Sequence, residues 1–309
     1  MHDFNVPLVF HPIYSQLNLP PRHRFPIDKY QALYDSLIHH GVLATRFYQP
    51  EPLNIDQLHR LYDRQYIDAL LYNRLTDKQM RRIGFPWSEQ LITRTLTACG
   101  GTRLTGELAI EHGMAINLSG GYHHAFSDFG SGFCMINDLY LAAQHMLSYE
   151  HINRVLIFDC DVHQGDGTAC LAQNNEDIVT VSLHCEKNFP YRKQHSDLDF
   201  ALQSQTNDNA YLQTVEQALT VALNCYDVDA IIYDAGVDIH QHDDLGHFNI
   251  TTNGIYERDY LVLKTALERQ LPLAAVIGGG YQRDISALTK VHLQLFKAAH
   301  QLTKHTNRS

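Results

Sequence analysis

The chain has 309 residues and a mass of 35.3 kDa, and 44% of its residues are hydrophobic, which is sufficient for a substantial globular core. Its formal net charge is −10 and its pI is about 6.0. This balance argues against a nucleic-acid partner, because phosphate binding needs clustered Lys and Arg. Cationic partners are easier to accommodate.

Cysteine usage and the N-terminus bear on location. The six cysteines are scattered, without a C-x-x-C pair, which is typical of free thiols in a reducing compartment. The start, "MHDFNVPLVF", lacks the basic segment and apolar run of a signal peptide, and no apolar stretch is long enough to span a bilayer. We therefore expect a cytoplasmic protein with no membrane contact.

The first part of the chain is predicted to be helical. Leu, Ile, Tyr and Ala recur there at mixed spacings of three and four, which predicts helices over 28–40, 55–75 and 88–113. Ser88 is a plausible start of the third helix.

The remaining chain alternates short β-branched runs with helical patterns. The runs predict strands over 154–161, 177–184, 229–238 and 273–281. The helical patterns lie at 138–150, 209–226 and 254–270. This alternation predicts a three-layer α/β/α fold with a mainly parallel central sheet, and without repeats or linkers we expect residues 1–309 to form a single domain.

One long segment, 184–209, has little periodicity. A loop of that length is more often a functional lid than an idle connection. We therefore expect a lid there.

Costly polar residues follow the predicted strand at 154–161, in "FDCDVHQGDG". Buried charges need a cation or dense hydrogen bonding. Because alternate residues of a strand share a face, Asp159, Asp161 and His163 would point the same way if the extended geometry persists. A D-x-H pair can bind one metal ion, but alone it is a weak signal, and the simpler alternative is a polar turn in which Asp166 and Thr168 cap the next helix.

A second strand ends in "IIYDAGVDIHQHDD". Asp238 lies beyond this strand end, level with Asp161 and His163, and is the predicted third ligand. Asp234 lies within the strand and is predicted to be a hydrogen-bonding support. Two carboxylates and one imidazole leave an open coordination position, as a catalytic zinc site requires.

Two adjacent histidines, His123 and His124, follow the glycines at 120–121. Glycine permits close approach to a ligand, so the pair can serve in proton transfer, although an H-H pair by itself is unremarkable. Asp159 and Asp166 remain available to orient the two imidazoles.

The last segment, "VIGGGYQRD", runs from a strand into three glycines and Tyr281. The glycines lack the spacing of a phosphate-binding loop, and a tight turn is the simpler reading. The Tyr281 phenol can donate a hydrogen bond to developing negative charge at a metal site.

Together these four segments resemble the zinc-dependent histone deacetylase family, with its arginase/deacetylase fold. The resemblance runs from "PPRHRFPIDKY" to "GGGYQRD", with the motifs in the same order. It implies that Asp161, His163 and Asp238 bind zinc, although ferrous iron accepts the same ligands.

The resemblance also implies catalytic roles. His124 would be the general base and acid, and His123 an electrostatic partner. Tyr281 would steady the oxyanion. Asp159 would hydrogen-bond His123, and Asp166 would hydrogen-bond His124.

Two further sites follow from the same resemblance. The family's narrow tunnel holds an aliphatic lysine chain between aromatic walls; the matching substrate-binding positions are Gly132, Phe133, Tyr191 as the opposite wall, and Gly279. The family also carries a structural K⁺ or Na⁺ near the zinc, and the matching positions are Asp159, Asp161, His163, Ser182 and Leu183.

The sequence departs from the family pattern at two positions. Gln164 replaces the second His of D-V-H-H-G-D-G, and Tyr122 replaces the Trp before the H-H pair. With "DAGVD" and "GGGYQ", these differences lean towards the class IV-like and bacterial branch.

The reaction implied is hydrolysis of an N-acyl amide, most simply N-ε-acetyl-lysine, and three alternatives remain open. The substrate could be an acetylpolyamine or another small N-acyl amine. A non-enzymatic acyl-lysine reader would not need His124 and Tyr281. A two-manganese ureohydrolase uses D-x-H-x-D, whereas Gly165 and His240 occupy the positions where its further carboxylates would lie.

Overall fold

A single eight-stranded sheet forms the centre of the computed structural model, which describes residues 1 and 3–304. The strand order is β2-β1-β3-β8-β7-β4-β5-β6, and every neighbouring pair is parallel. The strands are β1 (Leu8–Val9), β2 (Phe47–Tyr48), β3 (Met114–Asn117), β4 (Val155–Asp159), β5 (Ile178–Cys185), β6 (Leu198–Leu202), β7 (Ala230–Asp234) and β8 (Leu273–Val276).

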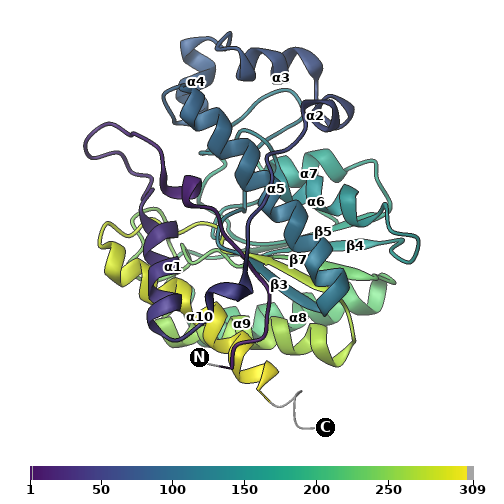
Figure 1. Cartoon of the computed structure of the whole chain (residues 1–309). Coiled ribbons are helices and arrows are strands. Elements are labelled where there is room, and N and C mark those ends of the chain that lie inside the picture. Colours follow the sequence, from purple (N-terminus) through teal and green to yellow (C-terminus); the bar gives the residue numbers. More distant parts are fainter. Residues whose placement is uncertain (2, 305–309) are drawn as a thin grey trace.

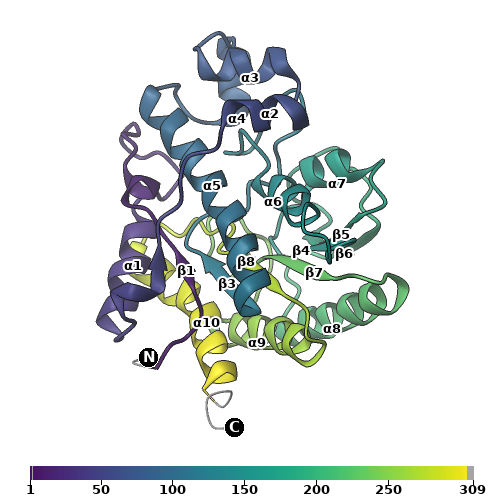
Figure 2. The same ribbon diagram turned by 45° about the vertical axis from the view of Figure 1, so that its right-hand side comes forward.

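Helices cover both faces of this sheet (Figure 1). One layer contains α1 (Lys29–His39), α8 (Asp208–Cys225), α9 (Thr252–Glu268) and α10 (Ile285–Thr303). The other contains α5 (Glu89–His112), α6 (Asp138–Met146) and α7 (Asp166–Ala172). The turned view in Figure 2 shows the two layers on opposite sides of the sheet. The predicted three-layer α/β/α fold with a parallel sheet is confirmed.

Three short helices lie beyond the sheet, near the start of α5 (Figure 1). They are α2 (Ile55–Leu61), α3 (Arg64–Leu71) and α4 (Asp77–Ile83). Two 3-10 turns, Pro12–Ser15 and Ala44–Arg46, complete the N-terminal part.

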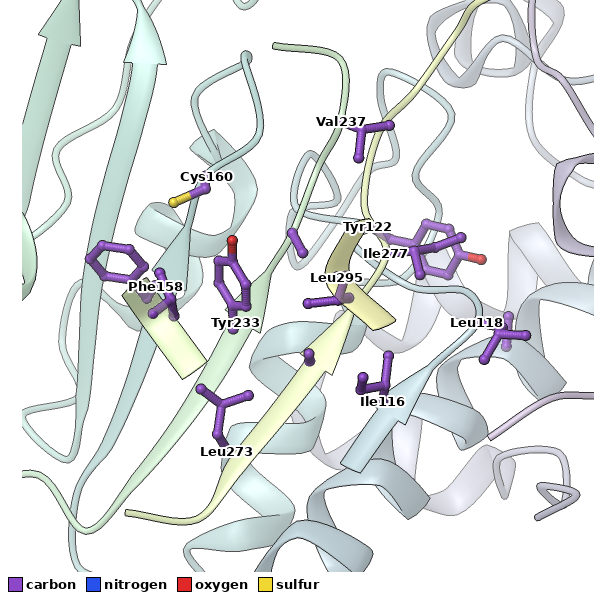
Figure 3. Close-up of a cluster of buried hydrophobic side chains, with 14 of the residues drawn as sticks. Ile116, Leu118, Tyr122, Phe158, Cys160, Tyr233, Val237, Leu273, Ile277 and Leu295 are labelled. Carbon is purple, nitrogen blue, oxygen red and sulfur yellow. The ribbon is translucent and has the colours of Figure 1, made fainter. Parts of the chain in front are cut away.

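Alternate residues of the central strands enter two different hydrophobic clusters. In β4, Leu156 and Phe158 pack in the cluster that includes α8 to α10, whereas Val155 and Ile157 pack with α5 and α6. Figure 3 shows part of the first cluster, where Phe158 lies near Tyr233. Neither face of such a strand is exposed to solvent, which explains its continuous apolar sequence.

The structure corrects two predicted elements. The helix expected over 55–75 is divided into α2 and α3, because the Asp63 carboxylate accepts a hydrogen bond from the Tyr66 N–H (2.8 Å) and starts a new helix. The irregular segment expected at 184–209 is shorter than predicted, because residues Leu198–Leu202 form β6, which pairs with β5. The loop proper spans residues 186–197.

Two further observations concern the cysteines and the lengths of the helices. All six cysteines are free thiols, and only Cys170 and Cys225 are exposed. Within residues 1 and 3–304, no helix has both the length and the apolar character needed to cross a bilayer.

Candidate metal centre and proton-transfer site

The predicted site residues gather where β4, β7 and β8 end. The register pairs Asp159 with Asp234 and Asp234 with Val276, so these strands end level with one another. In a parallel sheet, the loops after the strands therefore meet at one edge.

Asp161, His163 and Asp238 form a buried cluster at this edge. Their ligand atoms all lie within 4.8 Å of one another. His163 Nδ1 is 3.0 Å from Asp161 Oδ1 and 3.1 Å from Asp238 Oδ2. The structure thus brings the three predicted metal ligands together, although extended geometry ends at Asp159 rather than continuing to His163.

Backbone groups fix the orientation of these ligands. Asp161 Oδ1 accepts the His163 N–H (2.9 Å), and Asp161 Oδ2 accepts the Gly279 N–H (3.0 Å). Asp238 Oδ1 accepts the Val162 N–H (2.9 Å). The ligand positions are therefore built into the turns after β4 and β8.

The donor set fits a divalent metal ion. Asp238 Oδ2 is buried and makes no well-oriented hydrogen bond among the described residues, although His163 Nδ1 lies 3.1 Å away. Burial and the neighbouring Asp161 raise the pKa of Asp238 to about 7, so a cation at this position would be strongly favourable. A Cβ atom at Gly279 would overlap both carboxylates, so glycine there allows the close approach that a metal site needs.

His123 and His124 lie beside this cluster, and each has its own carboxylate. His123 Nδ1 is 2.7 Å from Asp159 Oδ2, and His124 Nδ1 is 2.6 Å from Asp166 Oδ1. The Nε2 atoms of the two rings are 3.1 Å apart, so one proton fits between them. The expected pairing of imidazoles with carboxylates is present.

The two histidines have opposite pKa shifts. Burial alone would lower the pKa of His123, but the carboxylates of Asp159 and Asp161 raise it well above its ordinary value. Burial, followed by the charge of His123, lowers the pKa of His124 to about 4. These shifts favour the charged form of His123 and the neutral form of His124 at neutral pH.

Asp234 does not behave as the predicted hydrogen-bonding support. Its side chain is fully buried, and neither oxygen has a hydrogen-bond partner among the described residues. It lies 3.9 Å from His123 Nδ1 and forms, with His123 and Asp159, a second group with metal-ligand geometry. Burial and Asp159 raise its pKa well above the ordinary value, which favours the neutral acid.

Two residues missed by sequence reasoning hold the turn before the histidine pair. Asp138 accepts hydrogen bonds from the N–H groups of Gly121 (3.2 Å) and Tyr122 (2.7 Å). The neighbouring Asn137 donates to the His123 carbonyl (3.4 Å) while also capping α6. "ND" before a helical pattern is a readable cap signal, but the sequence does not show which turn it reaches.

A third missed residue, Arg258, supports the turn that delivers Asp238. Its guanidinium donates to the carbonyls of Ala235 (3.1 Å) and Gly236 (2.6 Å), and it is fully buried beside Asp259. The adjacent Arg and Asp in "YERDY" give no sign of this distant contact.

Two phenylalanines lie near the site residues, Phe133 beside Tyr281 and Phe189 beside His124. The Phe133 ring lies 5.3 Å from both Phe25 and Phe85, and 5.9 Å from Tyr281. The Phe189 ring lies 4.8 Å from His124, nearly perpendicular to it. Gly132, next to Phe133, has a φ of +53°, and a Cβ there would lie 2.7 Å from the His124 ring and 3.2 Å from the Phe189 ring, so the position favours glycine.

The prediction of Tyr191 as the opposite wall is therefore wrong. Tyr191 is 99% exposed, whereas Phe189, two residues earlier, faces His124. An aromatic residue directly before Pro190 was the available signal.

Tyr281 lies close to the predicted ligands. Its ring is 6.4 Å from His163, and its N–H donates to Asp243 Oδ2 (2.7 Å). Burial, Asp161 and Asp238 raise the pKa of its phenol well above the ordinary value, so the phenol keeps its proton and remains a hydrogen-bond donor.

The remaining predicted positions divide into two groups. Ser182 is paired in register with Asp159, and Leu183 follows it in β5, so the backbone places the predicted monovalent-cation residues side by side. His240 instead contacts Thr252 (3.1 Å) and Gln282 (3.2 Å), and it is not part of the Asp161 cluster.

Comparison with known proteins agrees with this architecture. The sequence profile of the histone deacetylase domain matches residues 23–297. The chain belongs to the histone deacetylase family. It is accordingly a hydrolase of that family.

Three relatives are similar to this chain over half or more of its length. An uncharacterized protein of Picosynechococcus sp. is 45% identical and covers 95% of this chain and 98% of its own. Histone deacetylase 2 of Arabidopsis thaliana is 34% identical, over 60% of this chain and 49% of its own. An acetoin utilization protein of Staphylococcus aureus is 29% identical, over 75% of this chain and 65% of its own.

Solved structures support the fold. A histone deacetylase homologue crystallised with SAHA superimposes with a TM-score of 0.79 at 21% identity, over 96% of this chain and 88% of that one. The HD domain of HDA15 superimposes with a TM-score of 0.78 at 18% identity, over 97% and 92% of the two chains.

Proposed function

We propose that this histone deacetylase family member removes an acetyl or longer acyl group from the ε-amine of lysine. The observation that carries the proposal is the position of His124, uncharged and anchored by Asp166, beside the cluster of Asp161, His163 and Asp238. A proton acceptor next to a metal-ligand set is the arrangement needed to hydrolyse an amide with water.

In this proposal Asp161, His163 and Asp238 would hold a divalent ion, zinc or ferrous iron. When bound, such an ion polarises the amide carbonyl and lowers the pKa of water. Ser182, Leu183 and the turn at 159–163 would hold a structural K⁺ or Na⁺.

The protein's own groups carry the proton steps. His124 takes a proton from the attacking water and later returns one to the amide nitrogen, so that the C–N bond breaks to give a carboxylate and an amine. The charged His123 stabilises negative charge nearby. Tyr281 donates a hydrogen bond to the former carbonyl oxygen, which an ionised phenol would be unable to do.

The test is an assay of acyl-lysine peptides of increasing acyl length, in parallel with acetylpolyamines, before and after chelation and metal restoration. We expect hydrolysis of acyl-lysine that disappears on chelation and returns with zinc or ferrous iron. Turnover of acetylpolyamines alone would assign the chain to small N-acyl amines. Tight peptide binding without turnover, in metal-replete protein, would make it a reader.

Tyr281→Phe provides the matched inactive variant. It should keep the wild-type metal content and lose about 10²–10³ in kcat, the usual effect of removing one oxyanion donor. Undiminished kcat in this variant would remove Tyr281 from the mechanism.

A further inference from the structure

Gln164 departs from the family pattern, and its side chain makes three hydrogen bonds, two to the loop at 186–197 and one to Asp199 in β6. It is 1% exposed and directly follows His163. Its Nε2 donates to the Gln194 carbonyl (2.8 Å) and to Asp199 Oδ1 (2.9 Å), while its Oε1 accepts the Gln194 N–H (2.8 Å). A neutral imidazole has one donor and one acceptor, so the family's histidine would be unable to make all three bonds.

The loop held by Gln164 is the one that carries Phe189. It spans 186–197, between β5 and β6. The residue before Gln194 is Lys193, whose ammonium donates to the carbonyls of Asn188 (2.6 Å) and Pro190 (2.8 Å). These two carbonyls lie on either side of Phe189, so Lys193 closes the loop around the wall residue.

A continuous set of hydrogen bonds therefore leads from the turn at His163 to the segment that carries Phe189. It starts at His163, passes through the Gln164 amide to the backbone of Gln194, and continues through Lys193 to the residues that flank Phe189. Phe189 is 41% exposed, and its ring contacts are with His124 and His163. Little hydrophobic packing holds this side chain, so polar contacts of the loop must supply much of its order.

We propose that Gln164 is a positioning residue that, together with Lys193, holds the Phe189 wall over His124 and so sets the fit of the substrate chain. This inference rests on the proposed deacylase function, because the wall matters only if a chain passes it. Gln164 itself touches no reacting atom. Its loss should weaken substrate binding more than turnover, since His124, Tyr281 and the ligand cluster keep their own supports.

The first measurement follows KM and kcat for an acyl-lysine peptide in Gln164→Ala and Gln164→His, with metal content determined for each protein. Removing these bonds should raise KM about tenfold, with kcat within about threefold of wild type. Gln164→His, which retains at most part of the contacts, should fall between. Gln173→Ala, an exposed glutamine at the end of α7, is the matched control and should resemble wild type.

Lys193→Met tests the second step of the connection. It should raise KM, as Gln164→Ala does. The KM of the double variant should exceed that of the more affected single variant by no more than about twofold, because both residues act on the same loop. Independent, multiplicative effects on KM would overturn the connection between them.

Limited trypsin digestion tests the loop without reference to activity. Cleavage after Arg192, which is exposed in the loop, should be about tenfold faster in Gln164→Ala than in wild type or Gln173→Ala. Unchanged cleavage overturns the proposal for Gln164, even if the chain is an active deacylase. Faster cleavage in a chain that hydrolyses no acyl-lysine would support the role of Gln164 in holding the loop and would reject the proposed function instead.

Discussion

The floor and the rim of the site are built differently. The floor consists of Asp161, His163, Asp238, His123 and His124, all buried and held by short hydrogen bonds to one another, to carboxylates and to backbone N–H groups. The rim consists of Phe133 and Phe189, which lie on loops. The floor thus comes from strand ends that the sheet fixes, whereas the rim depends on how each loop is anchored.

The two sides of the rim also differ from each other. Phe133 lies among Phe25 and Phe85, and its N–H donates to the Ile83 carbonyl (2.7 Å) at a φ of +67°. Phe189 lacks comparable packing and depends on the hydrogen bonds of Lys193 and Gln164. Aromatic packing fixes one wall, and polar contacts fix the other.

The largest expected effect is at the floor. Asp238→Ala should abolish metal binding, because it removes one of the two proposed carboxylate ligands and leaves Asp161 and His163 as an incomplete set. Metal content per chain, measured by mass spectrometry after dialysis, should fall from about one to near zero. Asp227→Ala, an exposed aspartate before β7, is the control and should bind metal normally. Full occupancy in Asp238→Ala would refute the ligand assignment.

His124→Ala separates proton transfer from metal binding. The variant should retain metal, since His124 is not among the proposed ligands, but kcat should fall by about 10²–10⁴. Steady-state kinetics with the metal-loaded variant measures this loss. Wild-type turnover would show that His124 is not the base. Loss of metal would show that His124 also contributes to metal binding.

The comparison between floor and rim also explains how much the sequence could predict. Apolar runs followed by Asp and His predicted β4 and β7. Because parallel strands end at the same edge of a sheet, the same pattern also predicted that Asp161, His163 and Asp238 lie together. Strands as short as Leu8–Val9 carry too few residues for a periodic signal. Tyr191 was mistaken for the wall because loop direction is set by contacts such as those of Lys193, which have no period in the sequence.

The paired rim variants should have different signatures. Phe133→Ala should destabilise the fold by about 2 kcal/mol, less than a fully buried phenylalanine would, because the ring is only partly buried. Phe189→Ala should change stability by less than about 1 kcal/mol but raise KM about tenfold. Thermal unfolding and steady-state kinetics distinguish the two. Equal loss of stability in both would contradict the different anchoring of the walls.

The smallest expected effect is a shift in pH dependence. His124 must be uncharged to act as a base, and its pKa is lowered to about 4, so kcat/KM should persist below pH 6 and fall only as the pH approaches about 4. Asp159→Asn should move this acid limb upward, because His123 would lose its charge more readily and repel a proton on His124 less. A wild-type limb near 6.5 would contradict the opposite shifts of the two histidines.

Anomalous diffraction from a crystal of the metal-loaded protein tests the central claim most directly. We predict one strong peak at the zinc edge, within bonding distance of Asp161, His163 and Asp238 and with one position open to solvent. A peak bound instead by Asp159, Asp234 and His123, or two peaks of equal height, would contradict the account.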